Sequence, residues 1–294
     1  MTRLFCFGLG YTALALADLL QAEGIAVAGT VRSPEKAAQL RARGIEAHVL
    51  DRGRPLDAWA AALAGTTHLL SSVPPDEAGD PVIDRHGPDL RRLSGILWAG
   101  YISTTGVYGD RAGGWVDEDS PLAPAGPRGT RRVAAEAAWA ATGLPLHLFR
   151  LPGIYGPGRS ALDQLRAGRA QAVVKPGQVF SRIHVADLAR ALRASMARPN
   201  PGRAYNICDD EASPSVDVLD HAADLLGLPR LARVDFETAE MSPMARSFWS
   251  ESKRVSNRRL KAELGLDLLY PTYRHGLAAI LAGEGGDGRR PAVP

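Results

Sequence analysis

The sequence predicts an α/β protein with a doubly wound parallel sheet and a smaller, mostly helical C-terminal lobe. Three observations carry this prediction. Over the first 150 residues, short apolar runs alternate with longer stretches of helical period, which is typical of βαβ units. A glycine-rich turn follows the first apolar run. Beyond residue 150 the alternation ends, and Pro and Gly punctuate the chain.

The expected elements follow from these patterns in chain order. Strands are expected near 3–7, 25–30, 45–50, 66–71, 97–103 and 145–150, with helices near 11–23, 34–43, 55–64 and 129–142. Later helices are expected near 161–168, 187–198, 214–226, 254–264 and 271–282, with a strand at 205–208.

These elements divide the chain into a sheet domain and a lobe. We expect residues 1–153, completed by about 177–208, to form the sheet domain, and 154–176 with 209–282 to form the lobe. The Gly-rich end, 283–294, has nothing to bury and is expected to be a mobile tail.

The composition excludes several classes of protein. The 294 residues are 45% hydrophobic and 23% charged, which is a globular balance and not a disordered or fibrous one. No apolar run approaches the roughly 18 residues of a spanning helix, and no leader is evident, so we expect a cytoplasmic protein without a membrane partner. The net charge is only +3 and arginines are interspersed with acids, so we expect no nucleic-acid partner.

Cysteine and histidine usage points to no metal. Cys6 and Cys208 lie in apolar runs and are expected as reduced core residues. The seven histidines show no metal-binding spacing, so no metal ligands are expected. Both a monomer and a homodimer remain open.

The glycine turn Gly8-Leu9-Gly10-Tyr11-Thr12-Ala13 follows the first strand and opens the first helix. Gly8 allows a tight turn, Gly10 lets a pyrophosphate approach the backbone, and Ala13 lets helix and strand pack closely. The free N–H groups of the helix start, at Tyr11 and Thr12, would face the anion. The turn therefore predicts a dinucleotide site on a Rossmann-type sheet. A plain turn without a ligand is the alternative.

The end of the second strand selects between two dinucleotides. An acidic residue there would bind a free ribose 2′-hydroxyl, whereas Arg32 complements a 2′-phosphate and Ser33 can add a hydroxyl donor. We therefore expect NADP rather than NAD. The alternative is that Arg32 is a solvated charge beside the next helix.

Further cofactor contacts are expected where the third and fourth strands end. Asp51 could accept a hydrogen bond from the adenine amino group, or could simply cap the end of its strand. Ser72, Val73 and Pro74 fall at the carboxyl edge of the sheet, along which the cofactor would run.

Several motifs in order then carry a family resemblance. They are Gly8-x-Gly10-x-x-Ala13, Ser103-Thr-Thr-Gly-Val-Tyr-Gly-Asp110, Arg150-Leu-Pro-Gly-Ile-Tyr-Gly-Pro-Gly158, Arg182-Ile-His-Val-Ala-Asp187 and Tyr205-Asn206. Over about residues 3 to 282 the chain resembles the extended short-chain dehydrogenase/reductase superfamily, in its NAD-dependent epimerase/dehydratase group. The resemblance implies an NAD(P)-binding domain and a lobe that closes over a small-molecule substrate, often a nucleotide-sugar. It also implies that Thr104 hydrogen-bonds the reacting oxygen, and we place Pro152 among the cofactor contacts.

The chain departs from this family at the catalytic pair. The family carries Tyr-x-x-x-Lys on the helix after the second motif, and counting back from Glu136 places those positions at Arg128 and Arg132. Arginine stays protonated, with a pKa above about 12, so Arg128 cannot act as the tyrosine does. Arg132 could still donate to the nicotinamide ribose hydroxyls. In this the chain resembles the atypical members of the superfamily.

Other groups could supply the missing chemistry. Tyr108, Tyr155 and Tyr101 are candidate proton donors, and each could equally be a packing residue. Arg128, Arg182 and Arg254 could form an anion pocket for a phosphorylated or carboxylated substrate, or could be solvated. His184 fits a structural role before a helix better than that of a catalytic base.

Two functions from different classes therefore remain. One is an NADP-dependent oxidoreductase, or epimerase/dehydratase-like enzyme, with a nonstandard proton donor; the other is a catalytically silent NADP-binding sensor or scaffold. In both, the ligand is expected between the lobes, reached by Thr104 from the sheet side and by the segment 252–257 from the other, with the charged ends of Lys253 and Arg254 toward the cleft. The alternative is that Lys253 and Arg254 are surface cations near the start of a helix.

Overall fold

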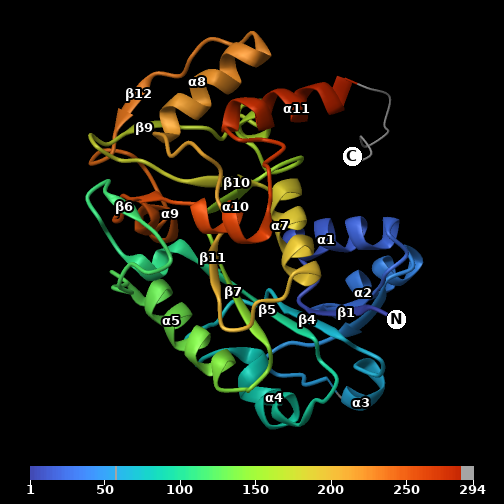
Figure 1. Cartoon of the computed structure of the whole chain (residues 1–294). Helices are drawn as coiled ribbons and strands as arrows, with labels where there is room; N and C mark the ends of the chain where they lie inside the picture. The colour runs from blue at the N-terminus through green and yellow to red at the C-terminus, as the bar shows by residue number, and fades with distance from the viewer. Residues whose placement is uncertain (57, 286–294) are drawn as a thin grey trace.

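The computed structural model describes residues 1–56 and 58–285 and is built around one sheet of seven parallel strands (Figure 1). The strands are β1 (Arg3–Phe7), β2 (Ala26–Val31), β3 (Glu46–Val49), β4 (His68–Ser71), β5 (Trp98–Thr104), β7 (Leu146–Leu151) and β11 (Ala204–Asn206). Their order is β11-β7-β5-β4-β1-β2-β3, so the strand order reverses between β1 and β4. This is the doubly wound Rossmann arrangement, and it confirms the predicted fold class.

Helices cover both faces of the sheet because its strands are apolar on both sides. In β1, Leu4 and Cys6 belong to one core cluster and Phe5 and Phe7 to another, since successive side chains of a strand point to opposite faces. The first cluster includes residues of four helices: α1 (Tyr11–Ala22), α2 (Pro34–Ala42), α7 (Val185–Ala197) and α10 (Arg258–Leu264). The second includes residues of α3 (Trp59–Ala62), α4 (Pro81–Arg92) and α5 (Pro127–Ala140).

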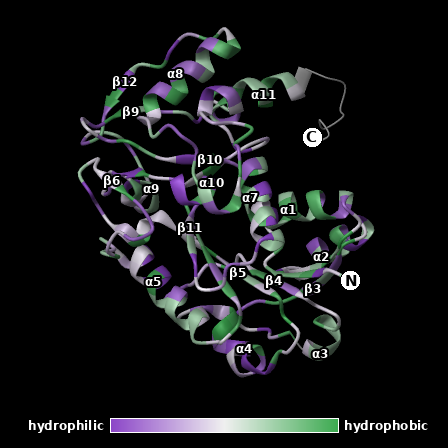
Figure 2. Cartoon of the chain, in the orientation of Figure 1, coloured by the Kyte–Doolittle hydropathy of each residue, from purple (hydrophilic) through white to green (hydrophobic). Residues whose placement is uncertain are grey.

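The lobe has its own small core. It is formed by residues of α6 (Ala161–Arg166), α8 (Ser215–Leu226) and α11 (Tyr273–Gly285). Figure 2 shows α8 banded by hydrophilic and hydrophobic residues, which is the pattern of a helix with one face in a core. The lobe is mostly helical, as predicted.

Three short parallel pairs accompany these helices. They are β8 (Gly153–Tyr155) with β10 (Arg182–His184), β9 (Ala172–Val174) with β12 (Arg233–Asp235), and β6 (Trp115–Val116) with β13 (Arg254–Val255). The sequence analysis expects none of these strands. Pairs of two or three residues carry too little periodicity to stand out in a single sequence.

The structure corrects two expected helices and adds one that is not expected. Helix α4 is not expected from the sequence, because Gly87 and Pro88 in its interior suggest a break. It is capped by Asp80, whose side chain accepts from Val82 N and Ile83 N. The helix expected near 55–64 is only the short α3. The helix expected over 254–264 is the strand β13 followed by α10 (Arg258–Leu264).

Two expectations concern the limits of the chain's parts. Helix α11 extends to Gly285, so the first residues of the expected tail are helical, and 286–294 lie outside the described residues. The expected division of the chain into a sheet domain and a lobe stays a prediction. Its bounds are 1–153 with about 177–208 for the sheet domain, and 154–176 with 209–282 for the lobe.

Cys6 and Cys208 are buried and unpaired, as expected. No helix within the described ranges has the length and apolarity needed to cross a bilayer. Within the same ranges, His, Cys, Asp and Glu side chains form no group of three or more that could hold a metal ion.

Candidate functional site

The glycine turn lies at the carboxyl edge of the sheet and is tied to β2. Leu9 N donates to Thr30 O at 2.7 Å and Gly8 N to Thr30 Oγ1 at 3.0 Å. Gly8 has φ +88°, and a Cβ there would come within 3.0 Å of Ser72 Oγ. Only glycine adopts this conformation readily, so Gly8 fixes the turn as the sequence predicts.

Gly10 faces open space at the start of α1. A Cβ built on it meets no atom within 4 Å, and α1 carries no side-chain cap. The first amides of a helix make no intrahelical bonds, and the N-terminus of a helix favours an anion, here at the start of α1. The Tyr11 hydroxyl donates to Pro157 O at 3.1 Å, and the Thr12 side chain is buried. This cradle fits the pyrophosphate of a dinucleotide.

Arg32 and Ser33 follow β2 as predicted, with different surroundings. Arg32 is exposed, and its guanidinium makes no hydrogen bond or ion pair within the part of the chain that the structure describes. Ser33 is the N-cap of α2, accepting from Lys36 N at 3.2 Å. Hydrogen bonds from the Glu35 amide and from Ser33 lower the pKa of Glu35. The hydroxyl that could donate to a phosphate is therefore already in use.

The ends of β3 and β4 supply two more predicted positions. Asp51 Oδ1 accepts from Gly53 N at 2.8 Å and from Arg54 N at 2.9 Å, so this oxygen caps a turn, as in the alternative interpretation. Ser72 Oγ donates to Gly8 O at 2.6 Å and links β4 to the glycine turn. Val73 approaches the same turn, and Pro74 is exposed beyond it.

A cleft of about 700 Å³ opens between the carboxyl end of the sheet and the lobe. Thr104 and Pro152 line it from the sheet, Arg128 from the start of α5, and Arg182 and Lys253 from the lobe. The cleft thus brings together Thr104 and Lys253, as the sequence analysis predicts. The Thr104 hydroxyl accepts from Gly106 N at 3.2 Å, which fixes its oxygen at the end of β5.

Arg254 does not line this cleft. Its guanidinium donates to Gly113 O and holds the loop before β6. The expectation that both Lys253 and Arg254 face the ligand is therefore wrong for Arg254. Successive side chains of an extended segment point to opposite sides, so Lys253 and Arg254 point away from each other. This could not be expected from a segment for which the sequence predicts a helix over 254–264.

The two arginines of α5 have distinct environments. The Arg128 guanidinium stacks on the Phe248 ring at 3.9 Å, at the wall of the cleft. Arg132 Nη1 donates to Ile102 O at 2.5 Å and to the Tyr101 hydroxyl at 3.2 Å, so this side chain braces α5 against β5.

The three candidate tyrosines are buried away from the cleft. The Tyr108 hydroxyl donates to Asn206 Oδ1 at 2.8 Å and accepts from Arg150 at 3.0 Å, and Tyr155 bonds to Thr272 O at 3.5 Å. Burial raises the pKa of Tyr101, Tyr108 and Tyr155. Of the described residues that line the cleft, none is a tyrosine. We therefore assign no proton transfer to these three groups.

A buried ion pair holds α5 on the sheet. Glu136 accepts from Arg150 Nη2 at 2.9 Å and from Ser103 Oγ at 2.5 Å, with side chains 5% and 7% exposed for Glu136 and Arg150. In the prediction from sequence, Glu136 serves only to count positions. An acidic residue two turns into the expected helix is the feature of the sequence that could have indicated this ion pair.

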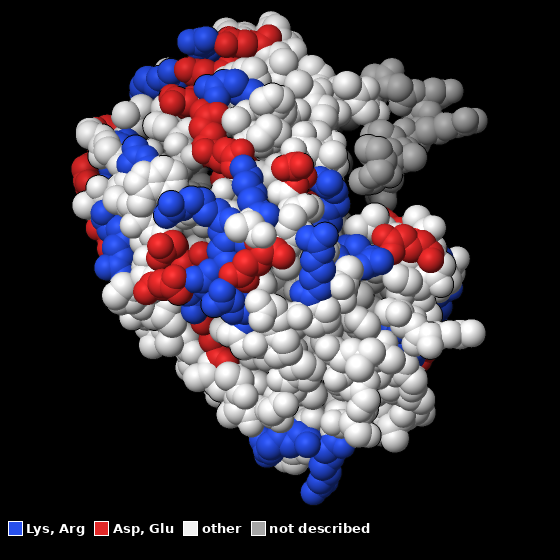
Figure 3. Space-filling view, in the orientation of Figure 1, with Lys and Arg blue, Asp and Glu red and all other residues white. Residues whose placement is uncertain are grey.

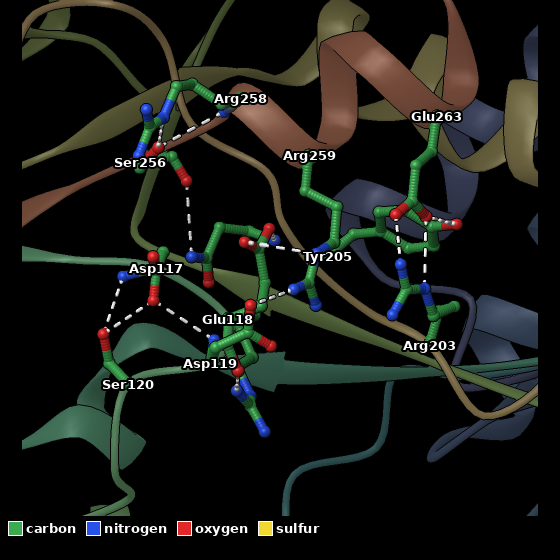
Figure 4. A network of polar contacts seen from close by, with 12 residues as sticks. Asp117, Glu118, Asp119, Ser120, Arg203, Tyr205, Ser256, Arg258, Arg259 and Glu263 are labelled. Atoms are coloured by element: carbon green, nitrogen blue, oxygen red, sulfur yellow. Dashed lines mark hydrogen bonds and ion pairs between the residues drawn. The ribbon is translucent and has the colours of Figure 1, made fainter.

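A second polar network, shown in Figure 4, fixes α10 over β11. Glu118 accepts from Asn206 N at 2.8 Å, and Arg259 bonds to Asp119 at 2.6 Å. The Tyr205 hydroxyl donates to Glu263 at 3.0 Å. Because β13 directly precedes α10 and pairs with β6, these bonds also set the place of the neighbouring Lys253.

Lys253 is a buried amine at the cleft wall. It is 8% exposed, and its Nζ pairs with Glu251 Oε2 at 2.5 Å. Burial lowers the pKa of Lys253. Glu251 is not among the residues predicted from the sequence. The Glu-x-Lys spacing, which puts both side chains on one side of an extended segment, could have indicated this pair.

Arg182 and His184 sit on β10. Arg182 donates to Phe180 O and to Ser213 Oγ, both at 2.8 Å, and burial lowers the pKa of its guanidinium. His184 caps α7 by accepting from Ala186 N at 3.2 Å, and burial lowers its pKa to about 4. These contacts give His184 the structural role that the sequence analysis favours.

Comparison with known proteins identifies the class. Residues 52–208, more than half of the chain, match the NAD dependent epimerase/dehydratase family, and the chain belongs to this family. It is 29% identical to "Protein YeeZ" of Escherichia coli K12 over 289 residues, which cover 92% of this chain and 97% of that protein.

Solved structures agree with this assignment. A functionally unknown conserved protein from Silicibacter pomeroyi DSS is 50% identical, with a TM-score of 0.90 over 96% of this chain and 99% of that one. UDP-glucuronic acid 4-epimerase from Bacillus cereus, solved in complex with NAD, has a TM-score of 0.73 at 15% identity and covers 94% and 96% of the two chains. At this low identity the epimerase shares the fold alone.

Proposed function

We propose that the protein is an NADP-dependent oxidoreductase that reduces or oxidises an anionic small molecule in the cleft, without the family's Tyr-x-x-x-Lys pair. The observation that carries this proposal is the lining of the cleft. Thr104 at the end of β5 shares one cavity with the cations Arg128, Arg182 and Lys253. A guanidinium pairs with carboxylates and phosphates, so the substrate carries such a group.

The cofactor would be held by the glycine turn and by Arg32. The Gly10 cradle and the first amides of α1 take the pyrophosphate, and the exposed Arg32, which lacks a partner in the described chain, takes the 2′-phosphate. When bound, the reduced dinucleotide supplies a hydride.

The proton in this reaction would come from Lys253. Arg128 and Arg132 occupy the places of the family's pair, and α5 contains neither tyrosine nor lysine. Lys253 is the buried amine of the cleft, and its lowered pKa brings it closer to neutral pH, where a group can both give and regain a proton. In carbonyl reduction Thr104 would orient the carbonyl oxygen, Lys253 would give that oxygen a proton as the carbon is reduced, and Glu251 would stabilise the charged lysine.

Cofactor choice is tested by titrating NADPH and NADH against the wild type, Arg32→Glu and the control Arg169→Glu, which makes the same charge change at an exposed position of the lobe. We expect tighter binding of NADPH, a preference that Arg32→Glu removes and Arg169→Glu keeps. Equal wild-type affinities for the two cofactors contradict the NADP assignment.

The chemistry is tested by NADPH oxidation with 4-carboxybenzaldehyde, a carbonyl compound that carries an anionic group. Lys253→Met should abolish turnover while the Kd of NADPH stays the same, and Lys253→Arg should not restore it, because arginine does not release its proton. Unchanged turnover in Lys253→Met assigns the proton to another group.

A catalytically silent NADP-binding sensor is the second candidate. It is favoured by the fact that Arg132 braces β5 and that all three candidate tyrosines are buried. Tight NADPH binding without turnover of any anionic carbonyl compound supports this function.

A further inference from the structure

The short helix α9 (Pro243–Phe248) presents apolar side chains to the cleft. Met244 and Phe248 lie four residues apart, on one face of the helix, and both line the cavity. They are 72% and 47% exposed, and no residue of α9 is buried. Large apolar side chains left open along a cavity wall are typical of a ligand site.

Apart from the contact of Phe248 with Arg128, the bonds that hold α9 in place lie outside this face. Gln178 Nε2 donates to Glu251 O at 2.7 Å, Arg246 Nη2 donates to Ala239 O at 2.9 Å, and Lys175 Nζ bonds to Trp249 O. These bonds fix the backbone around the helix. The Met244 side chain therefore remains free to contact a ligand.

The apolar wall continues beyond the helix. Val179, Phe180 and Trp249 also line the cavity, and the rings of Phe180 and Trp249 pack edge to face at 5.1 Å between centroids. This part of the cleft removes apolar ligand surface from water, which is favourable in proportion to the area buried.

The cations lie directly against this wall. The face of the Arg128 guanidinium covers Phe248 at 3.9 Å, which leaves the N–H groups at its edge for an anion. Arg182 lines the same cavity, and its guanidinium donates to three neutral oxygens of Phe180 and Ser213. Figure 3 shows blue and red side chains next to one another over much of the drawn face, with blue ones alone at its lower edge. In the cleft, by contrast, Glu251 is the single acid among the described lining residues, and it is paired with Lys253. The other charged lining residues are four cations: Arg128, Arg131, Arg159 and Arg182.

We infer that the cleft binds an organic anion with an apolar body: a carboxylate or phosphate on an aliphatic or aromatic group, with the anion at Arg128 and Arg182 and the body against Met244 and Phe248. The inference rests on the proposed function, because it names the substrate class of the same cleft. This ligand differs from a nucleotide-sugar, because the polar hydroxyls of a sugar would not pack favourably against the apolar wall.

Calorimetric titration of the NADP⁺-saturated protein tests this inference, with octyl phosphate, inorganic phosphate and UDP as probes. Octyl phosphate should bind at least tenfold more tightly than inorganic phosphate, because its chain buries apolar surface. Met244→Ser should weaken octyl phosphate several-fold and leave inorganic phosphate unchanged. Leu228→Ser, which changes a 43% exposed leucine outside the cleft, should alter neither.

Equal affinity for the two phosphates, no effect of Met244→Ser, or tighter binding of UDP than of octyl phosphate would overturn the inference. A separate NADPH titration distinguishes it from the proposed function. Failure of NADPH to bind, with the octyl phosphate response intact in protein without cofactor, rejects the proposed function and leaves this inference standing. Normal NADPH binding with no preference for octyl phosphate rejects this inference alone.

Discussion

The glycine turn after β1 and the first turn of α5 differ in what they keep of the family's features. At the turn, Gly8 has the required positive φ and Gly10 opens onto free space. At α5, Arg128 and Arg132 stand where we propose that the family has its tyrosine and lysine, and Arg132 braces α5 against β5. The glycine turn would bind the cofactor through its backbone, whose conformation few substitutions preserve. The two positions on α5 would act through their side chains, which can change without loss of the fold. Cofactor binding and the chemistry can therefore change independently.

The largest expected effect is at the turn. Gly10→Val should weaken NADPH binding by more than about 1000-fold, or about 4 kcal/mol, because its side chain fills the pyrophosphate space. Since a Cβ at Gly10 meets no atom, circular dichroism and the melting temperature should stay close to the wild type. The same substitution at Gly126, the N-cap of α5, is the control for fold. Normal binding by Gly10→Val would show that the turn is not the phosphate site.

The anchor of α5 gives the next effect. Glu136→Gln leaves the Arg150 charge buried without its partner and should cost about 3 kcal/mol in urea unfolding. Asp224→Asn, which weakens an exposed pair with Arg230, should cost much less than this. Equal costs for the two variants would contradict the structural role given to the buried pair.

His184 should make stability depend on pH. Burial lowers its folded pKa to about 4, below the unfolded value near 6.5, so the unfolded chain binds more protons between these values. Stability should therefore rise with pH through this window and be lost as pH falls from about 6.5 to about 4, by up to about 3 kcal/mol. His184→Asn keeps a good N-cap and removes the titration, so thermal melts of this variant should lack that part of the slope.

The smallest expected effect concerns Arg132 and sharpens the comparison directly. Arg132→Met loses the bonds to Ile102 O and to the Tyr101 hydroxyl, and should cost about 1–2 kcal/mol of stability. If Arg132 also donates to the nicotinamide ribose, the Kd of NADPH rises several-fold. Arg230→Met, which loses exposed pairs with Asp220 and Asp224 outside the cleft, is the control. An unchanged Kd would leave Arg132 as a brace alone.

The local pattern of the chain determines the sheet, the glycine turn and the place of Thr104. Alternation of apolar runs with helical periods requires only near neighbours, and a turn such as Gly8–Ala13 acts through its own backbone. The same reasoning misses α4, because Gly87 and Pro88 weaken a helix whose burial against the sheet stabilises it.

Tertiary structure alone decided which side chains meet in the cleft. Lys253 and Glu251 line the same cavity as Thr104, next to β13, which pairs with β6. This pairing joins residues far apart in the chain and has no local signal. Tyr108 became a buried link between Arg150 and Asn206, and Arg254 a support for the loop at Gly113. A side chain's type gives what it can donate or accept, but its partner and its exposure depend on segments brought together only by folding.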